Sequence, residues 1–246
     1  MNFYSVIIGT ELLNGRRKDA HFSFLNNELL KRGWEHKASF VIDDDPSFME
    51  DVFRLIKNDK DAVMFSFGGI GATPDDFTRQ CAANVFTNEN MEIHEGAKKL
   101  IMDRFGDDIY PHRINMANLP INASLLQNVV TNIPGFYLED KYFFVPGFPS
   151  MAQSMIVEAL NKLYPQNKSK YRTTMTAICS ENDLIDTMKT LSKDVSLSSL
   201  PKIEGEQRRC IISISGYDQN LCDQELNKFC QYCLDNDILY TLGDEE

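Results

Sequence analysis

The feature that most constrains the fold is a glycine-rich loop that directly follows a short apolar run. Residues 62–67 read AVMFSF, and residues 68–76 read GGIGATPDD. A short apolar run bounded by turn residues predicts a buried β-strand. In an open parallel sheet, ligands bind just beyond the carboxyl ends of the strands. The sequence therefore predicts an α/β fold with a ligand site at residues 68–76.

The composition of this loop favours an anionic ligand. Its glycines, Gly68, Gly69 and Gly71, let the backbone turn sharply and approach a ligand closely. Thr73 is expected to cap a helix that opens at Pro74, and the free N–H groups of that helix would point at an anion. No GK[ST] follows the glycines, so the loop differs from that of the P-loop nucleotide hydrolases.

Two acidic residues complete the loop and have two interpretations. Asp75 and Asp76 are favourable at a helix N-terminus through the helix dipole alone. Beside a bound phosphate, a carboxylate is repelled unless a divalent cation bridges the two charges. The pair therefore also indicates Mg²⁺ or a similar hard ion.

Apolar spacing divides the chain into two domains. The first two-thirds alternate between strand and helix periods, which is typical of βα units in a mainly parallel sheet. Residues 164–170 are polar after Pro165 and form the expected linker. We expect a three-layer α/β domain at residues 1–164 and a small α+β domain at residues 171–246. In the first domain we expect strands at residues 3–8, 38–42 and 62–67, helices at 22–30, 46–56, 75–85, 93–105 and 149–163, and a hairpin of 137–138 and 142–145.

Three further motifs lie at the ends of expected strands. GTELLNG at residues 9–15 follows the first strand, and an acidic run at residues 43–45 ends the second. One aspartate of this run is expected to cap the helix opening at Pro46, and another to reach the ligand. Pro-Gly pairs at residues 134–135 and 146–147 flank the hairpin, where they mark turns or a backbone that faces an anion.

Charge and hydropathy limit the partners. The net charge of −11 argues against a nucleic-acid partner, because phosphate neutralisation needs a basic face. No apolar run approaches the roughly 18 residues of a membrane span, and the start of the chain lacks the features of a secretory signal. We expect a cytoplasmic protein that binds a small phosphorylated ligand and neither nucleic acid nor membrane.

The cysteines predict free thiols. The six cysteines are scattered through the chain and do not form a dense disulfide framework. Cys230 and Cys233 have the CxxC spacing of zinc and redox sites, but they fall in a helical pattern with no second pair. Buried helix positions are the favoured interpretation, and zinc or redox chemistry is the alternative.

The order GTELLNG, DDD, GGIGATPDDFT, PGF and PGFP resembles the CinA (competence/damage-inducible protein A) family over residues 3–163. The resemblance is to its amino-terminal molybdopterin-binding domain, which is similar to the MoaB and Mog proteins, followed by the family's small α+β domain. Nothing in this chain corresponds to the carboxyl-terminal deamidase domain of longer CinA proteins. The resemblance implies a crevice between two glycine loops that binds a pterin or nucleotide phosphate.

The resemblance also assigns roles to residues. It implies catalytic roles for Asp44, Asp75 and Asp76, with Asp44 and Asp76 as metal ligands. The implied ligand-binding residues are Gly9, Thr10, Glu11, Gly15, Gly68, Gly69, Gly71, Thr73, Thr78, Pro134, Gly135, Pro146 and Gly147. Polar residues that many CinA-type proteins carry are replaced in this chain by Thr10, His21, Arg113, Met116 and Met151. Arg113 and its neighbour His112 are alternative phosphate contacts.

We therefore expect a nucleotide pyrophosphatase that acts on ADP-ribose-type substrates with Mg²⁺, Mn²⁺ or Co²⁺. The ion would neutralise the pyrophosphate and lower the pKa of a bound water, and the backbone amides of residues 69–73 would hold the developing charge. One alternative is a molybdopterin adenylyltransferase, with molybdopterin as ligand. A second is a non-catalytic binding module. The resemblance further implies a homo-oligomer, a dimer or a trimer.

Overall fold

The computed structural model describes residues 1–204 and 207–243, and it divides the chain into two compact units, Met1–Asn167 and Lys168–Glu246. The division falls inside the linker expected at residues 164–170. Each unit has its own sheet and its own apolar core, so each is described by itself.

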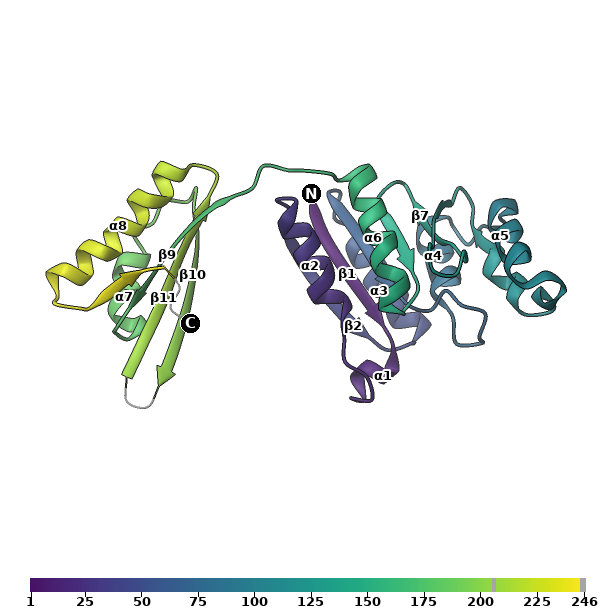
Figure 1. Cartoon of the computed structure of the whole chain (residues 1–246), viewed down its shortest axis with the longest axis horizontal. Helices are drawn as coiled ribbons and strands as arrows, with labels where there is room; N and C mark the ends of the chain where they lie inside the picture. The colour runs from purple at the N-terminus through teal and green to yellow at the C-terminus, as the bar shows by residue number, and fades with distance from the viewer. Residues whose placement is uncertain (205–206, 244–246) are drawn as a thin grey trace. The chain divides into compact units, whose positions relative to one another are not determined.

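A six-stranded sheet forms the centre of the first unit, with the order β2-β1-β3-β8-β7-β6 (Figure 1). Every strand runs parallel except β7, which is antiparallel to both of its neighbours. The strands are β1 (Asn2–Ile8), β2 (His36–Ile42), β3 (Ala62–Phe67), β6 (Ser124–Leu126), β7 (Gly135–Leu138) and β8 (Tyr142–Val145). The expected mainly parallel sheet is confirmed.

Helices cover both faces of this sheet and give the expected three layers. One apolar cluster joins the sheet to α3 and α4, and a second joins the opposite face to α2 and α6. The helices are α1 (Thr10–Leu13), α2 (His21–Lys31), α3 (Pro46–Lys57), α4 (Thr78–Phe86), α5 (Glu95–Phe105) and α6 (Pro149–Leu163). Smaller elements connect them: β4 (Met91–Ile93), β5 (Asn118–Pro120) and the 3-10 helices η1 (Gly106–Ile109) and η2 (Arg113–Ala117).

Alternation along the strands explains the two cores. Phe3 and Ile7 of β1 contribute to one cluster, whereas Val6 and Ile8 contribute to the other, because successive side chains of a strand point to opposite faces. All six residues of β3 are buried, as the uninterrupted apolar run predicts. Removing one of these large buried side chains costs about 3–5 kcal/mol in typical cores.

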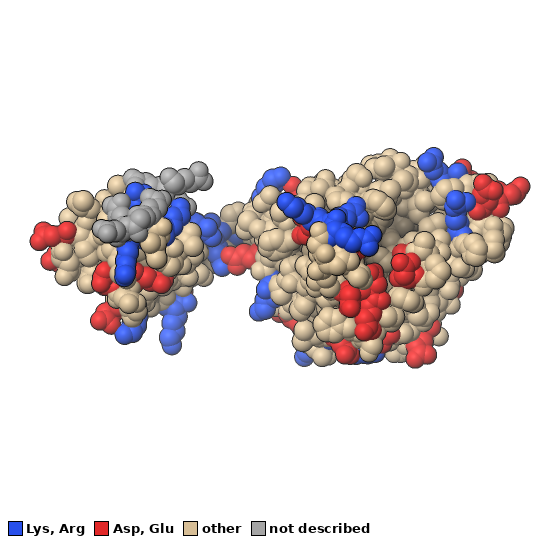
Figure 2. All heavy atoms as spheres, turned by 90° about the horizontal axis from the view of Figure 1, so that it is seen from below, with Lys and Arg blue, Asp and Glu red and all other residues tan. Residues whose placement is uncertain are grey.

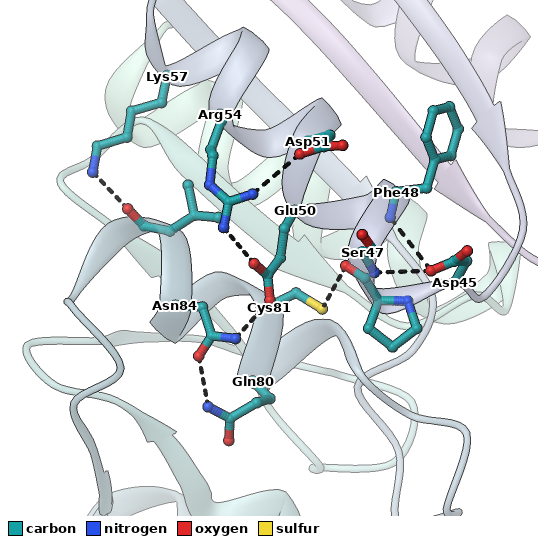
Figure 3. Close-up of polar contacts among 12 residues, drawn as sticks. Asp45, Ser47, Phe48, Glu50, Asp51, Arg54, Lys57, Gln80, Cys81 and Asn84 are labelled. Carbon is teal, nitrogen blue, oxygen red and sulfur yellow. Dashed lines mark hydrogen bonds and ion pairs between the residues drawn. The ribbon is translucent and has the colours of Figure 1, made fainter.

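Polar contacts fix α3 against α4 (Figure 3). Asp45 caps α3 by accepting hydrogen bonds from the backbone N–H groups of Ser47 and Phe48 at 2.9 and 3.4 Å. Asn84 of α4 donates its side-chain amide to Glu50 of α3 at 2.6 Å. The expected cap of this helix is therefore Asp45, and the neighbouring Asp44 is free for another role.

Two helix starts differ from the expectation. The helix after the glycine loop begins at Thr78, so Thr73 is not its cap and Pro74 is not its first residue. The reason is that Asp76 binds the backbone of Gly71 and Thr73, which holds residues 70–77 in a loop. The expected helix at residues 93–105 begins at Glu95, after the strand β4.

The second unit is a small antiparallel α+β fold, as expected from the sequence. Its sheet has the order β10-β11-β9-β12, and α7 and α8 contribute to a single apolar cluster with it. The elements are β9 (Tyr171–Ala177), α7 (Glu181–Met188), β10 (Ser196–Glu204), β11 (Gln207–Gly216), α8 (Gln219–Asp235) and β12 (Tyr240–Leu242). Within the described residues, no helix of either unit is long and apolar enough to span a membrane.

The cysteines are free thiols, as expected. Cys230 and Cys233 lie buried on α8, and Cys230 Sγ contacts Met175 Sδ at 3.9 Å. Burial raises the pKa of both thiols, to about 11 for Cys233. Among the residues that the structure describes, no group of three or more metal-ligating side chains includes this pair.

Candidate functional site

A cleft of about 550 Å³ opens at the carboxyl ends of β1, β3 and β8. The hairpin β7–β8 explains how two Pro-Gly pairs meet there. Because β7 and β8 are antiparallel, the start of β7 and the end of β8 lie at the same edge of the sheet. Pro134 and Pro146 therefore both line the cleft. Figure 2 shows this hollowed face, with basic and acidic side chains gathered on different sides of the hollow.

Glycines set the path of the main loop. Gly68 has a φ of +99°, and a Cβ there would lie 2.7 Å from the carbonyl oxygen of Ile8. Gly69 also has a positive φ, and a Cβ there would collide with the Thr78 hydroxyl. That hydroxyl is buried and donates to the carbonyl oxygen of Gly68 at 2.9 Å. Thr78 therefore closes the base of the loop and does not face the cleft.

Asp76 holds the loop together from inside. Its carboxylate accepts from the N–H of Gly71 at 2.9 Å and the N–H of Thr73 at 2.7 Å. The Thr73 hydroxyl donates to the same carboxylate at 2.5 Å. The guanidinium of Arg79 binds the carbonyl oxygens of Ile70 and Gly71. These contacts shape the loop, so Asp76 has a structural role whatever its role in chemistry.

Asp75 is the more available carboxylate of the loop. It is exposed and lines the cleft. Hydrogen bonding from the Thr73 side chain lowers its pKa below the ordinary value of an aspartate. Asp75 is therefore ionised at neutral pH, as a metal ligand or proton acceptor must be.

Asp44 joins the end of β2 to the first loop. Its Oδ2 accepts from the backbone N–H and the hydroxyl of Thr10, both at 2.9 Å. Glu11 follows on α1, and its carboxylate folds back over Gly9, where an added Cβ would lie 2.9 Å from Glu11 Oε2. Asp44 follows β2 and Glu11 follows β1, whereas Asp75 and Asp76 follow β3. Because β1 lies between β2 and β3 in the sheet, the two pairs of carboxylates line the cleft from different sides.

Arg17 is a cleft residue that the sequence reasoning missed. It is the only Lys or Arg among the described residues that line the cleft. Its guanidinium lies 3.5 Å from Glu11 Oε1 and 5.3 Å from the ring centre of Phe148. The basic run at residues 16–18, directly after GTELLNG, was the signal that could have identified it.

Part of the cleft lining is apolar. Met116, Ile133, Met151 and Phe148 line it together with Ile8. Two of the positions at which this chain departs from the CinA pattern, Met116 and Met151, therefore lie in the cleft.

His21 and Arg113 lie elsewhere. His21 is buried behind the wall, and its Nε2 donates to the carbonyl oxygen of Gly147 at 3.2 Å. Burial lowers the pKa of His21 below its ordinary value. Arg113 lines a neighbouring groove.

The structure brings most of the expected site residues together. The expected residues that line the cleft are Gly9, Glu11, Asp44, Gly68, Gly69, Gly71, Thr73, Asp75, Asp76, Pro134, Pro146 and Gly147. Thr10, Gly15, Thr78 and Gly135 do not line it. Gly135 lies within β7, where a Cβ would approach the carbonyl oxygen of Phe144 to 2.6 Å, so strand packing explains this glycine.

These features define a class of protein: a three-layer α/β unit that presents glycine loops and carboxylates to a small molecule at the carboxyl edge of its sheet. The chain belongs to the family described as "Probable molybdopterin binding domain", whose model matches residues 5–166. The expected fold class and the expected family are thereby confirmed.

Individual relatives agree with this assignment. The chain is 28% identical over 211 residues to a protein of Pyrococcus furiosus, covering 80% of this chain and 84% of that protein. It is 27% identical over 241 residues to a CinA-like protein of Flavobacterium psychrophilum, covering 90% of this chain but 56% of that protein. A solved structure described as the protein CinA with unknown function, from Thermoplasma acidophilum, superposes with a TM-score of 0.59 at 28% identity. The superposition covers 66% of this chain and 98% of the other.

Proposed function

We propose that the cleft binds a nucleotide diphosphate of the ADP-ribose type and that the chain hydrolyses its pyrophosphate with a divalent metal ion. The observation that carries this proposal is the mixed lining of the cleft. The backbone of the glycine loop and several carboxylates line it together with the apolar side chains of Met116, Met151 and Phe148. A volume of about 550 Å³ suits a ligand of this size.

The two kinds of lining suit the two parts of such a ligand. A pyrophosphate placed against the loop of residues 69–73 meets the backbone N–H groups of Gly69, Ile70 and Ala72, because those of Gly71 and Thr73 donate to Asp76. Backbone N–H groups bind anions without bulk positive charge. Arg17 contributes a positive charge and is the only lysine or arginine among the described residues that line the cleft. Its guanidinium lies over the ring of Phe148. An aromatic base placed between Met116 and Met151 gains sulfur and aromatic contacts. The ligand thus matches both the polar and the apolar lining.

The donor set fits a hard cation that arrives with the phosphates. Asp44, Asp75 and Asp76 offer carboxylate oxygens, and Mg²⁺ is commonly bound by one or two carboxylates plus phosphate oxygens and waters. The described residues contain no group of three or more side chains that would hold a metal alone. Such an ion neutralises phosphate charge and makes water a better nucleophile.

The residues of the chain have separable roles in this proposal. Asp75, ionised and exposed, accepts or orients a proton of the attacking water. Asp76 holds the shape of the loop by accepting from the N–H groups of Gly71 and Thr73. Water attacks one phosphorus, the bridging P–O bond breaks, and AMP and ribose phosphate leave. Arg17 stabilises the charge on the leaving phosphate.

The test is a turnover assay of the purified chain on ADP-ribose, other nucleotide diphosphates, and ATP with molybdopterin, each with Mg²⁺, Mn²⁺ or Co²⁺. Asp75→Asn should reduce turnover by about 100-fold or more with an unchanged melting temperature. Asp76→Asn should reduce turnover and also lower the melting temperature, because the loop loses charge-assisted hydrogen bonds. If Asp75→Asn turns over like the unmodified chain, the assignment of Asp75 is wrong.

The family assignment favours a second candidate, a molybdopterin adenylyltransferase that uses the same cleft. The matched family is described by molybdopterin binding. Release of pyrophosphate from ATP in the presence of molybdopterin would identify this reaction, whereas AMP from ADP-ribose identifies the hydrolase. Binding of either ligand without turnover would identify a non-catalytic module. Light scattering on the same sample tests the expected dimer or trimer.

A further inference from the structure

A second groove, of about 830 Å³, lies on the other side of the glycine loop. It shares Ala72 and Thr73 with the cleft, so the loop is the wall between the two. The rest of its lining comes from Pro74, from Arg79 of α4, and from residues within 108–115, around η1 and η2. None of the residues assigned to catalysis above lines this groove.

Arg79 is the buried cation of the groove. Its exposed fraction is only 8%. The negative charge of Asp76 acts on its guanidinium, but within the described residues no carboxylate oxygen is close enough to form an ion pair with it. Its Nη1 donates to the carbonyl oxygens of Ile70 and Gly71, and these are its only hydrogen bonds to described residues. A guanidinium has five N–H donors, so the N–H groups on Nε and Nη2 of Arg79 form no hydrogen bond to the described residues, and Arg79 lines the groove.

Arg113 supplies a second, prearranged guanidinium. It lies over the ring of Phe105, with 4.4 Å from its central carbon to the ring centre. Its Nη1 donates to the carbonyl oxygen of Asp108 at 3.0 Å. These two contacts hold the side chain in place although the residue is exposed, which lowers the entropy cost of binding. His112 and Asn115 line the same wall and add further donors.

The groove is basic, whereas the chain as a whole is acidic. Two arginines line it against one carboxylate, that of Asp108, whereas the chain carries a net charge of −11. A buried guanidinium without a paired carboxylate is costly and is stabilised when an anion binds beside it. Planar guanidinium groups bind phosphate and carboxylate through paired N–H donors.

We propose that the groove formed by Arg79, Arg113 and His112 is a second anion site, separate from the cleft, that takes a phosphate or a carboxylate. The site does not depend on the hydrolase proposed above. Because Arg79 also holds the loop at Ile70 and Gly71, an anion in the groove contacts the same side chain that shapes the cleft wall.

The test is an NMR titration of the isotope-labelled full chain with inorganic phosphate at constant ionic strength. The amide signals of Tyr110 and of residues 112–115 should shift and saturate. Arg113→Gln should raise the Kd measured at these signals roughly tenfold, or about 1.4 kcal/mol, because the anion loses charge-assisted hydrogen bonds. The matched control is Arg104→Gln, which removes the same charge from an exposed position on α5 outside the groove.

A second titration, with ADP-ribose, distinguishes the sources of the anion. If Arg113→Gln weakens phosphate and ADP-ribose alike, the groove holds a phosphate of the cleft ligand, and the proposal of a site separate from the cleft is wrong. If it weakens phosphate alone, the groove holds a free anion. The proposal is also overturned if phosphate leaves the signals of Tyr110 and of residues 112–115 unmoved, or if Arg104→Gln weakens binding as much as Arg113→Gln. Neither titration measures turnover, so the hydrolase proposal and the anion-site proposal can each be disproved without the other.

Discussion

The protonation state of His21, a buried side chain next to the cleft wall, makes the stability of this region depend on pH. Its ring lies 4.4 Å from that of Phe67, centre to centre, and Nε2 donates to the carbonyl oxygen of Gly147 in the cleft wall. The other ring nitrogen, Nδ1, is buried and has no hydrogen-bond partner among the described residues. Protonation would place an N–H group there without an acceptor, which explains why the pKa of His21 is lowered by burial.

His36 is in a similar position, with Nε2 at 3.0 Å from the Ser5 hydroxyl, a buried Nδ1 and a pKa lowered by burial. A histidine with a lowered native pKa stabilises the fold above its unfolded pKa of about 6.5 and loses that contribution as pH falls. The free energy of unfolding should therefore fall between pH 7 and 5, by at most about 1.4 kcal/mol per pH unit for each histidine.

Denaturant unfolding at several pH values measures this loss. The double variant His21→Asn and His36→Gln should flatten the dependence between pH 7 and 5. The exposed His112→Gln should keep the original slope. An unchanged slope in the double variant would show that other groups cause the acid sensitivity.

At the scale of elements, strands were easier to predict than the loops between them. The strand expected at residues 62–67 has the same ends as β3. All six of its residues are buried, and such a short buried run is typical of a central strand. The start of α4 was wrong, because the carboxylate of Asp76 can satisfy either the amides of a helix N-terminus or those of its own loop. Sequence spacing does not distinguish these two arrangements. The position of Arg17 over Phe148 could not be predicted either, because the two residues are far apart in the sequence.

The hairpin β7–β8 gives a prediction at this scale. Gly135 of β7 packs so closely on β8 that a Cβ would lie 2.6 Å from the carbonyl oxygen of Phe144. Gly135→Ala should therefore lower the free energy of unfolding by about 1–3 kcal/mol, as overpacking of a core usually does.

Gly147→Ala is the comparison, because its nearest contact would be 3.4 Å and its φ is not positive. Thermal unfolding of both variants measures the difference. Equal melting temperatures would mean that the strands separate to accommodate the methyl group.

At the scale of the whole molecule, the cleft belongs to one unit. Every residue that lines it lies within Met1–Asn167. The only tryptophan, Trp34, belongs to the same unit, where its indole N–H donates to the carbonyl oxygen of Tyr164 at 3.2 Å. Asn167 should be kept in any shortened chain, because its backbone N–H donates to the carbonyl oxygen of Arg32.

Residues 1–167 alone should therefore fold and keep the site. We expect the tryptophan fluorescence midpoint of thermal unfolding to agree with that of the full chain within about 2 °C, a difference of about 0.5–1 kcal/mol for a domain of this size. Binding of ADP-ribose should change less than twofold. A midpoint lower by 5 °C or more would show that the second unit stabilises the first.

The parallel pairing of β3 with β8 also decides the order in which the site is made during synthesis. Met64 pairs with Tyr142, so β3 leaves the ribosome long before its partner. At about 5–20 residues per second, the edge of β3 that later pairs with β8 remains without a neighbour for several seconds, although five of its six residues are apolar. The nascent chain is then most prone to aggregate, and no ligand can rescue it, because Pro146 and Gly147 of the cleft have yet to be made.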